Sequence, residues 1–531
     1  MNAILFNGRI YPQCRVQKRP SIVVITGDRI QEVGEDLSYF RRRYPGYQQI
    51  NLDGRTVIPG FVDSHTHFYF WASRLDTVHL EGTRSFAEAL TIIEQFTPTR
   101  RTNDWITGDG WSADRWEPYH LPNAAELDAV TGERPAALYS KDQHILWVNS
   151  QALRLAGIDK STPDPAGGWI DHDPQTGQPN GILRENPAHF LVTRLISRSD
   201  PDRMDVLWDE AARIARSRGV TGFHSVEDPA AWAYFQQRHR QGKLGFRVHY
   251  YYPVAMLDEL IESGTSSGEG DDTLRVGGVK IFTDGSLGAQ TALLKEPYLG
   301  KPDHVGVEVT SVDELVRLIG KAARHNLACA VHAIGDRAVA NVITAHETVG
   351  RNEHLRHRIE HVQLISRTDI PRLRKTGVIA SMQPTHCPSD RELVARYWGK
   401  RGRNAYVFKS ILKNNIPVTF GSDCPIEPLN PIEGIHAAVN RTGYGERGGR
   451  FYPEECLTVA EAVHGFAAGP AYASGREAFS GRILPGFQAD LAILDDDIYS
   501  MPKLKLYSAR VAATIFSGHV AHRTPSFPAI E

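Results

Sequence analysis

Short runs of apolar residues recur through the middle of the chain, and stretches with helical periodicity lie between several of them. Residues 313–326 and 369–377 have the spacing of apolar positions that is typical of amphipathic helices. Alternating strands and helices favour a parallel α/β architecture, and eight strands predict a closed (β/α)8 TIM barrel rather than an open sheet. The eight apolar runs occupy residues 57–65, 219–226, 246–252, 275–282, 328–333, 358–363, 378–383 and 417–423.

The two ends of the chain are β-rich and are punctuated by turn residues such as Asn-Gly, Gly-Asp and Pro-Gly. Neither end is long enough to form a hydrophobic core by itself. We therefore expect residues 1–57 and 481–531 to pair into one small domain, a β-sandwich made from both chain ends. Residues 58–480 are then expected to form the barrel.

The connection between the first two predicted barrel strands is much longer than the others. It runs from His67 to Gly219, whereas ordinary βα connections have about 2–6 residues. The sequence therefore predicts a subdomain inserted into the barrel after its first strand, at about residues 70–215.

The composition argues against several classes of protein. Of the 531 residues, 41% are hydrophobic and 23% are charged, and the formal net charge of −2 indicates no nucleic-acid partner. No apolar run approaches the ~18 residues of a membrane-spanning helix, and the first residues lack the pattern of a secretory signal. The five cysteines form no C-x-x-C pair and are expected to be free thiols, which favours a cytoplasmic location.

His65 and His67 close the first apolar run. Side chains two residues apart on a strand point the same way, so these two imidazoles can converge on one metal ion. By itself, the H-x-H spacing fits two ordinary polar residues at the end of a strand equally well. Three later runs also end in a residue that can bind a metal, namely His332, His361 and Asp423. Barrel active sites lie at the carboxyl ends of the strands, and His and Asp suit zinc-like ions, so the set predicts a metal centre.

Lys280 lies inside the fourth run, in the segment VGGVKIFTDGSLG. A lysine in an apolar strand pays a desolvation cost unless its amine is paired or neutral. One interpretation is a salt bridge with Asp284. The other is a neutral amine that has bound carbon dioxide as a carbamate, an anionic oxygen donor that could bridge two metal ions.

Several segments together resemble the amidohydrolase superfamily: VIPGFVDSHTHF, GVKIFTDGSLGAQTA, HAIGDRAV, RIEHVQ and GSDCPIEPLNP. They are most similar to the amidohydrolase-3 type, the subgroup that includes N-substituted formamide deformylase. That subgroup has a long insert after the first barrel strand, and GRILPGFQADLAIL resembles its returning β-domain strands. The resemblance covers essentially the whole chain and implies a metal-dependent hydrolase on a TIM barrel.

The resemblance also implies a role for each predicted metal ligand. His65, His67 and Asp423 would hold one divalent ion, and His332 and His361 would hold a second. Some relatives work with a single ion. In that case His332 and His361 would contact the substrate or act as weaker ligands.

Two residues would then have further roles. Lys280, carboxylated by carbon dioxide, would bridge the two ions together with a hydroxide. Asp423 would act as general base and afterwards as general acid toward the departing amine. The expected function is hydrolysis of a non-peptide C–N bond, in an amide, a formamide or a cyclic amide, by attack of the metal-bound hydroxide.

Some residues are weaker candidates for contact with the substrate, and each fits a structural role equally well. Trp111 and Trp116 would either wall an apolar pocket or pack in the core of the insert. Lys141, Asp142 and His144 would either reach over the barrel mouth or lie on a solvated loop. Residues that follow or end barrel strands would either tune the metal ligands or make ordinary hydrogen bonds: Asp284, Gln290, Asp336 and Gln383.

We expect zinc as the metal, a small molecule as the substrate, and a homodimer by analogy with the family. Two other functional classes stay open, namely a deaminase or ester hydrolase on the same barrel, and a non-catalytic binding module. Lys280 and the β-rich ends count against the deaminase and phosphotriesterase types. The complete set of ligand positions counts against a module that has lost catalysis.

Overall fold

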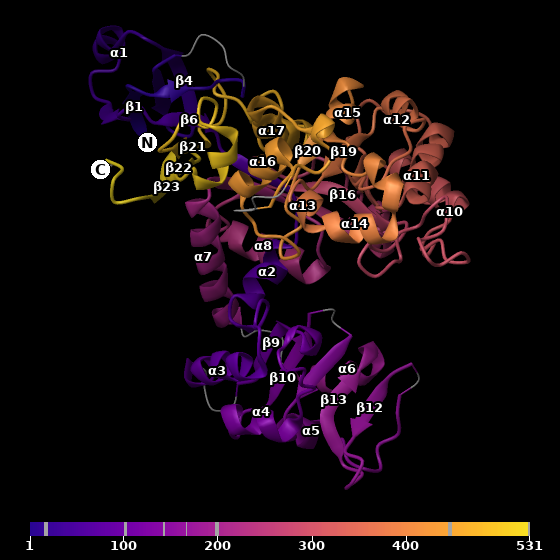
Figure 1. The fold of residues 1–531 in the computed structure, drawn as a ribbon. Coiled ribbons are helices and arrows are strands. Elements are labelled where there is room, and N and C mark those ends of the chain that lie inside the picture. The colour runs from indigo at the N-terminus through magenta and orange to yellow at the C-terminus, as the bar shows by residue number, and fades with distance from the viewer. Residues whose placement is uncertain are drawn as a thin grey trace. The chain divides into compact units, whose positions relative to one another are not determined.

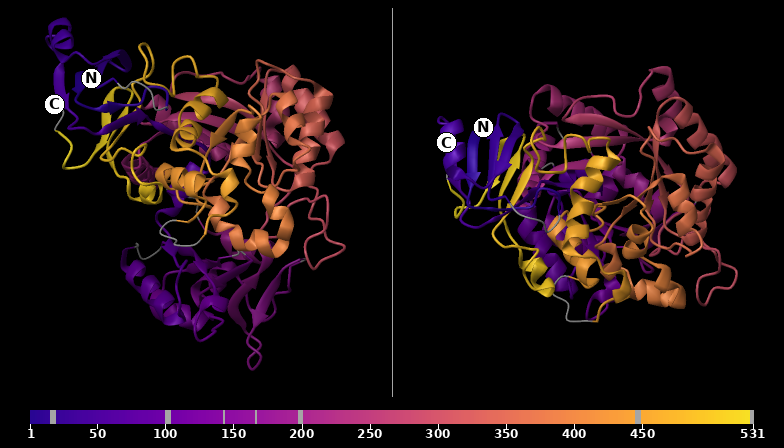
Figure 2. Two further views of the ribbon diagram at one scale, coloured as in Figure 1. Left: turned by 45° about the horizontal axis from the view of Figure 1, so that its top comes forward. Right: turned by 90° about the horizontal axis from the view of Figure 1, so that it is seen from above.

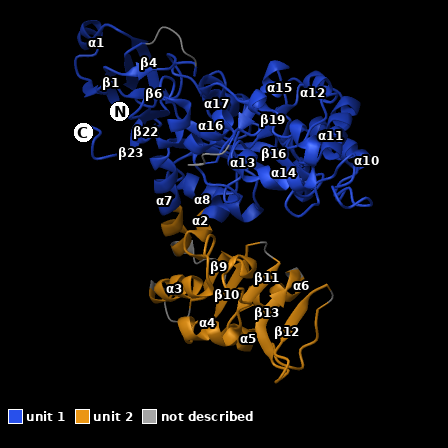
Figure 3. Cartoon of the chain, viewed as in Figure 1, with its two compact units in different colours: residues 1–71, 210–531 blue, residues 72–209 orange. Residues whose placement is uncertain are grey.

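The computed structural model describes residues 1–14, 20–99, 104–141, 144–165, 167–196, 201–443 and 449–528. The chain forms two compact units (Figure 3). Unit 1 comprises Met1–Trp71 and Glu210–Glu531, and unit 2 comprises Ala72–Asp209. No helix in the described part of the chain is long and apolar enough to span a membrane.

The centre of unit 1 is an eight-stranded parallel sheet in which each strand pairs with the next one along the chain (Figure 1). Each of the eight apolar runs contributes one strand. A parallel bridge between Thr66 and Cys424 joins the two end strands, and Asp423 N–H donates to the carbonyl of His65 (2.7 Å). The sheet therefore closes in the manner of a TIM-like barrel. Its strands are β7 (Phe61–Thr66), β14 (Val220–Ser225), β15 (Arg247–Pro253), β16 (Leu274–Phe282), β17 (Ala328–Ala333), β18 (Arg358–His361), β19 (Ile379–Met382) and β20 (Val418–Phe420).

These strands are largely buried because both faces of a parallel sheet are covered. Every residue of β14, β18, β19 and β20 is buried. In β16, a side chain at Gly278 would place its Cβ 2.0 Å from the carbonyl oxygen of Ala328 in β17. Glycine at this position therefore permits the close pairing of β16 with β17.

Helices lie along the outer side of the barrel strands (Figure 2). One example is α10, Val312–Arg324, in which the side chain of the N-cap residue Ser311 accepts from Glu314 N–H. The other helices of this layer are α8 (Pro229–Arg240), α9 (Leu257–Glu262), α11 (Asp336–Val349), α12 (Ile370–Thr376), α15 (Phe408–Lys413), α16 (Pro431–Asn440), α17 (Val459–Phe466) and α18 (Ala468–Ala473). The shorter α13 (His386–Ser389) and α14 (Arg391–Tyr397) follow β19, α2 (Phe68–Arg74) follows β7, and α7 (Pro201–Ser217) precedes β14.

The two chain ends meet in unit 1. A four-stranded sheet has the order β4-β3-β1-β5, a five-stranded sheet has the order β2-β6-β21-β22-β23, and residues of both sheets share one buried hydrophobic cluster. Strands from the amino-terminal end are β1 (Asn2–Phe6), β2 (Arg9–Ile10), β3 (Ile22–Thr26), β4 (Arg29–Gly34), β5 (Gln48–Asn51) and β6 (Thr56–Pro59), with helix α1 (Leu37–Arg43) after β4. Strands from the carboxyl-terminal end are β21 (Leu491–Leu494), β22 (Val511–Phe516) and β23 (His519–Arg523).

The first apolar run is shared between two sheets. Its first part is β6, which pairs with β2 and β21, and its second part is β7 of the barrel. The chain changes sheets at Gly60, whose N–H donates to the carbonyl of Asp490 (2.8 Å). The terminal sheets therefore extend to Pro59, slightly beyond the predicted limit at residue 57.

Unit 2 follows the first barrel strand in the sequence and has its own six-stranded sheet, in the order β12-β13-β11-β10-β9-β8. Its strands are β8 (Val78–His79), β9 (Ile106–Trp111), β10 (Ala136–Ser140), β11 (Ile145–Val148), β12 (Trp169–His172) and β13 (Pro179–Arg184). Its helices are α3 (Phe86–Phe96), α4 (Ala124–Thr131), α5 (Ser150–Ala156) and α6 (Glu185–Thr193). Two hydrophobic clusters form the core of this unit.

Candidate metal centre

Three of the predicted ligands come together at the carboxyl end of the barrel strands. His65 on β7, His361 at the end of β18 and Asp423 after β20 are buried, and each offers one ligand atom within 4.8 Å of the others. The rings of His65 and His361 have centroids 4.9 Å apart. These residues are far apart in the sequence, and the closed sheet alone brings them together.

The backbone at two of these ligands is unusual. His361 has a φ of 74° and Asp423 a φ of 60°, both in the left-handed region that non-glycine residues rarely adopt. Such conformations persist where the surrounding structure enforces them, and they concentrate at functional sites. Here the buried carboxylate of Asp63 accepts from His65 N–H and Ser422 N–H (3.1 Å each) and holds the ends of β7 and β20 together.

The carboxylate of Asp423 faces both histidines of the H-x-H pair. Its Oδ1 lies 3.2 Å from His67 Nε2 and 3.4 Å from His65 Nε2. Burial opposes ionisation of Asp423, but the electrostatic interactions with the surrounding imidazoles, including the hydrogen bond to His67, outweigh it and hold the pKa of the carboxyl well below its usual value. For His67, burial lowers the pKa, and the hydrogen bond to Asp423 outweighs this effect and raises it overall. Asp423 is therefore ionised near neutral pH.

Buried hydrogen-bond partners orient the imidazoles. Glu360 Oε2 lies 2.5 Å from His65 Nδ1, and Gln383 Oε1 lies 2.9 Å from His361 Nδ1. With each Nδ1 engaged, Nε2 is the nitrogen left to bind a metal, which is the arrangement that metal-binding histidines usually have. Arg358, two residues before Glu360 on β18, forms a fully buried ion pair with that carboxylate.

His332 and Lys280 border the same cluster. The rings of His332 and His361 have centroids 4.5 Å apart. Lys280 is buried, and its Nζ has no hydrogen-bond partner among the described residues. Burial lowers the pKa of Lys280 from 10.5 to about 8. Burial and the nearby Lys280 charge lower the pKa of His332 to about 3 and that of His65 to about 4, so both imidazoles are neutral near pH 7.

The salt bridge considered for Lys280 and Asp284 is not formed in the structure. The Asp284 carboxylate instead accepts from the backbone N–H groups of Leu293 (2.9 Å), Ile334 (3.1 Å) and Gly335 (2.8 Å). Burial nevertheless raises the pKa of Asp284 to about 7. Asp284 therefore orders the loop after β16 and does not pair with the Lys280 amine.

These residues fit a divalent metal by their chemistry. Neutral imidazoles and an ionised carboxylate are the usual donors to zinc-like ions, and they converge here in a buried site. The buried amine of Lys280 has no hydrogen-bond partner among the described residues, which is costly unless a further ligand satisfies it. Carbon dioxide bound to that amine would supply an additional oxygen donor.

The two tryptophans suggested as pocket walls pack inside unit 2. Trp111 and Trp116 are buried in one hydrophobic cluster, with ring centroids 6.0 Å apart. Their indole N–H groups donate to Leu138 carbonyl (2.8 Å) and to Thr83 Oγ1 (3.0 Å). The structure thus places both in the core of that unit, where their polar atoms are satisfied.

The remaining candidates have local partners. In unit 2, Lys141 pairs with Glu81 (2.5 Å), exposed His144 pairs with Glu185 (3.0 Å), and Asp142 lies outside the described residues. In unit 1, Asp336 accepts from Lys295 N–H (2.9 Å), and the carbonyl of Gln290 lies 2.7 Å from His304 Nε2. Of the weaker candidates, Gln383 contacts a predicted ligand directly, and Asp284 Oδ1 lies 3.5 Å from His332 Nε2.

Two further residues beside the cluster carry no distinctive sequence signal. His386, in the segment SMQPTHCPSD, is buried, and its Nε2 lies 3.9 Å from Asp423 Oδ2. Glu227 accepts from Tyr69 N–H (3.2 Å) and Phe70 N–H (2.7 Å), and so fixes the start of α2 directly after His67. The only sequence feature that could have indicated His386 and Glu227 is a polar residue that follows an apolar run. Many residues with a purely structural role have the same feature.

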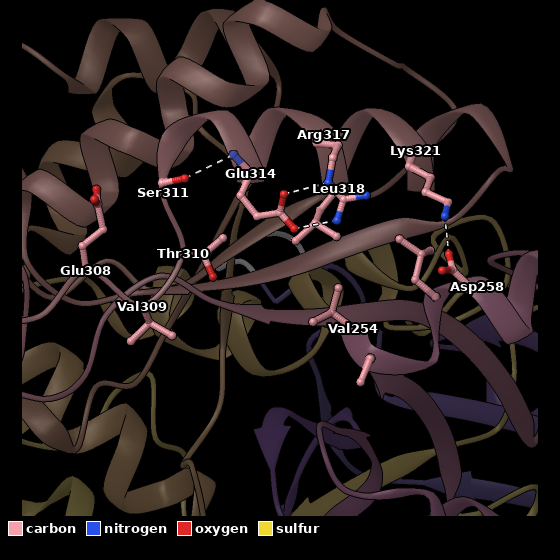
Figure 4. Close-up of a pocket in the computed structure, with 12 residues that line it drawn as sticks. Val254, Asp258, Glu308, Val309, Thr310, Ser311, Glu314, Arg317, Leu318 and Lys321 are labelled. Carbon is pink, nitrogen blue, oxygen red and sulfur yellow. Dashed lines mark hydrogen bonds and ion pairs between the residues drawn. The ribbon is translucent and has the colours of Figure 1, made fainter.

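A surface hollow of unit 1 lies away from these residues. A groove of about 710 Å³ runs between Val254–Asp258 and the start of α10 (Figure 4). Four of its charged residues form two ion pairs, Arg317 with Glu314 and Lys321 with Asp258. None of the predicted metal ligands lines it, so the metal centre and this groove are separate features.

Known proteins resemble the chain over nearly its whole length. Residues 48–522 match the family model described as the amidohydrolase family. The protein YtcJ of Bacillus subtilis (strain 168), named as an amidohydrolase, is 32% identical over 98% of this chain and 99% of its own length. The N-substituted formamide deformylase of Arthrobacter pascens is 28% identical, over 93% of this chain and 94% of the deformylase.

A solved structure agrees with these sequence matches. The crystal structure of a metal-dependent hydrolase from Pyrococcus furiosus superposes with a TM-score of 0.79 and 31% identity, covering 94% of this chain and 100% of that one. The family match covers all eight barrel strands, and three of the expected ligand positions, His65, His361 and Asp423, lie together in the structure. The chain belongs to the amidohydrolase family.

Proposed function

We propose that the protein is a metal-dependent hydrolase that cleaves a non-peptide C–N bond in an amide, a formamide or a cyclic amide. The observation that carries this proposal is the buried convergence of His65, His361 and Asp423 at the carboxyl end of the barrel. The names of its relatives, an amidohydrolase and a formamide deformylase, support a hydrolase acting on C–N bonds.

His65, His67 and Asp423 would hold one divalent ion, and His332 and His361 a second. A carbamate on Lys280 would bridge them. When bound, such ions lower the pKa of a coordinated water and polarise the carbonyl of the substrate.

Residues of the chain would transfer the proton of the attacking water and keep the imidazoles oriented. Asp423 lies at the mouth of the barrel with a depressed pKa, so it is ionised and can accept a proton from the attacking water. As the C–N bond breaks, the same carboxyl would pass that proton to the departing nitrogen. Glu360 and Gln383 would keep the imidazoles of His65 and His361 oriented throughout.

Further features belong to the same proposal. The two terminal sheets share one core, which supports a small β-sandwich domain, and unit 2 would be an insert of the barrel. All five cysteines are free thiols, which supports a cytoplasmic location. We propose zinc as the metal and a homodimer as the assembly, to be tested by metal analysis and sedimentation.

The test is turnover of a panel of formanilide, N-methylformamide and hydantoin by Zn²⁺-loaded protein, followed by amine release or ring opening. At least one amide should react. Chelation should abolish turnover and added Zn²⁺ should restore it. Asp423→Asn should lower kcat/KM by about 10²-fold or more, because it removes the proton-transfer group.

The matched control is Asp258→Asn, which alters an exposed carboxylate paired with Lys321 and should leave kcat/KM unchanged. A folded Asp423→Asn protein that turns over amides like the wild type would contradict the assigned role. If aminopurines or phosphotriesters reacted and amides did not, the reaction class would be wrong.

A further inference from the structure

One large apolar side chain beside the metal centre is exposed. Phe282 ends β16 and has a relative exposure of 48%, whereas the eight other residues of this strand are buried or half-buried. It is separated from Lys280 by one residue, so both side chains leave the strand on the same face. An aromatic ring therefore stands over the residue that would bridge the metal ions.

Distances confirm that the ring borders the site. The ring centroid of Phe282 lies 5.0 Å from Lys280 Nζ and 5.2 Å from the ring centroid of His332. One part of the ring contacts these buried polar groups, and the remainder is open. A molecule whose polar group reaches the metal ligands would therefore have Phe282 beside it.

The position of Phe282 is fixed by the segment before α10. Thr310 Oγ1 donates to the carbonyl of Phe282 (2.6 Å), and Val309 N–H donates to the carbonyl of Thr283 (2.9 Å). Val309, labelled in Figure 4, is itself 57% exposed. The anchored backbone limits how far the ring can move, and a preorganised aromatic surface binds at a low entropic cost.

We propose that Phe282 is a specificity-determining residue that packs against an apolar substituent next to the scissile bond. The inference rests on the proposed amide hydrolysis and narrows its substrate class to amides with an aryl or bulky alkyl group. The scissile carbonyl would face the cluster of His65, His361 and Asp423, and the substituent would cover the open part of the ring. Aromatic contact and apolar burial both favour this arrangement.

The test compares two probes that chelate metals through the same two oxygens and differ only in their substituent. Benzohydroxamate and acetohydroxamate are titrated calorimetrically into Zn²⁺-loaded wild type, Phe282→Ala and Phe282→Leu. The wild type should prefer benzohydroxamate, Phe282→Ala should reduce that preference about tenfold, and Phe282→Leu should retain part of it. Tyr39→Ala, which removes a 40% exposed aromatic ring on α1, is the control and should keep the wild-type preference.

Acetohydroxamate affinity also reports whether the metal centre is intact. The proposal predicts that it is unchanged in Phe282→Ala. Equal losses for both probes would contradict it, because Phe282 would then support the metal centre rather than the substituent. An unchanged preference in Phe282→Ala, or no binding of either probe to the wild type, would also overturn it.

Turnover measurements distinguish a failure of this inference from a failure of the proposed function. The kcat/KM ratio of formanilide to N-methylformamide should fall in Phe282→Ala in parallel with the hydroxamate preference. If the wild type hydrolysed no amide, the proposed function would fail, and the hydroxamate titrations would still decide the role of Phe282.

Discussion

Lys280 is the residue whose environment departs most from the ordinary behaviour of its type. Its amine is buried without a hydrogen-bond partner among the described residues, and Asp284, the nearest acidic residue in the sequence, is engaged by three backbone N–H groups. Burial lowers the pKa of Lys280 from 10.5 to about 8, so the amine is mainly protonated below about pH 8 and mainly neutral above it. A neutral amine is the form that reacts with carbon dioxide.

We therefore predict a carbamate whose occupancy increases with pH. In Zn²⁺-loaded protein with ¹³C-bicarbonate, a protein-bound carbamate signal should grow between about pH 7 and about pH 9, as the neutral amine becomes more abundant. Carbon-13 NMR measures it. Lys280→Met should lack the signal, and Lys321→Met, which changes a half-buried lysine paired with Asp258, should keep it. A signal that persists in Lys280→Met would refute the assignment.

At the residue scale, the residues that cluster at the strand ends could be predicted, but their hydrogen-bond partners could not. His65, His361 and Asp423 stand at the ends of apolar runs, which is a local signal. Gln383 was found in the same way, whereas Glu360 and His386 act on partners contributed by distant parts of the barrel. The sequence does not say which strands face each other across the barrel interior.

Strand β18 shows how one element carries several functions. Its side chains alternate, so Arg358 and Glu360 share a face and form a fully buried ion pair. Glu360 also lies 2.5 Å from His65 Nδ1 on β7. The strand thus links a buried charge pair to His65, a proposed metal ligand, and ends in another proposed ligand, His361.

Glu360→Gln should therefore affect both stability and metal binding. Removing the carboxylate charge leaves Arg358 buried and unpaired, which should cost about 3–5 kcal/mol of unfolding free energy in urea denaturation of the metal-free protein. Losing the partner of His65 should weaken Zn²⁺ affinity by about 10–100-fold in a competition titration.

Glu314→Gln is the control, because it breaks an exposed pair with Arg317 on α10, and both measurements should match the wild type. Wild-type metal affinity in a folded Glu360→Gln protein would show that Glu360 does not orient His65.

At the element scale, the eight apolar runs gave the positions of all eight barrel strands. The change of sheet at Gly60, within the run at residues 57–65, could not be predicted. Two strands joined end to end have the same pattern of apolar residues as one long strand. Helix α1 was also missed, since its residues Leu37–Arg43 contribute only Phe40 to the core and give no clear apolar stripe.

Across the whole molecule, the terminal sheets and the barrel form one compact unit, joined partly by a buried ion pair. Arg247 at the start of β15 donates to both carboxylate oxygens of Asp490, which directly precedes β21. Asp490 also accepts from Ser517 N–H (2.7 Å), and its carbonyl accepts from Gly60 N–H (2.8 Å). This contact lies at the amino-terminal ends of the barrel strands, opposite to the metal centre.

Arg247→Met should therefore lower the stability of the protein and leave its metal binding unchanged. The uncompensated Asp490 charge should lower the unfolding free energy by about 3–5 kcal/mol in urea denaturation, while Zn²⁺ content stays at the wild-type value. Loss of metal in a folded variant would contradict the independence of the two ends of the barrel.

At this scale, the long connection after His67 predicted additional structure, and the structure has unit 2 there, with its own sheet and cores. The internal arrangement of that unit could not be foreseen, because its sheet combines antiparallel and parallel strand pairs. Trp111 and Trp116 illustrate the difficulty, since aromatic residues suit a pocket wall and a core equally well from sequence.

The proposed metal centre is tested most directly by the metal content per chain of protein reconstituted with Zn²⁺ and bicarbonate, measured by elemental mass spectrometry. We expect about one to two tightly bound ions per chain in the wild type. We also expect a clear loss of metal in His361→Ala, which removes a member of the buried cluster. A wild-type protein that retains no divalent ion, or a His361→Ala protein that retains as much as the wild type, would contradict the proposed metal centre.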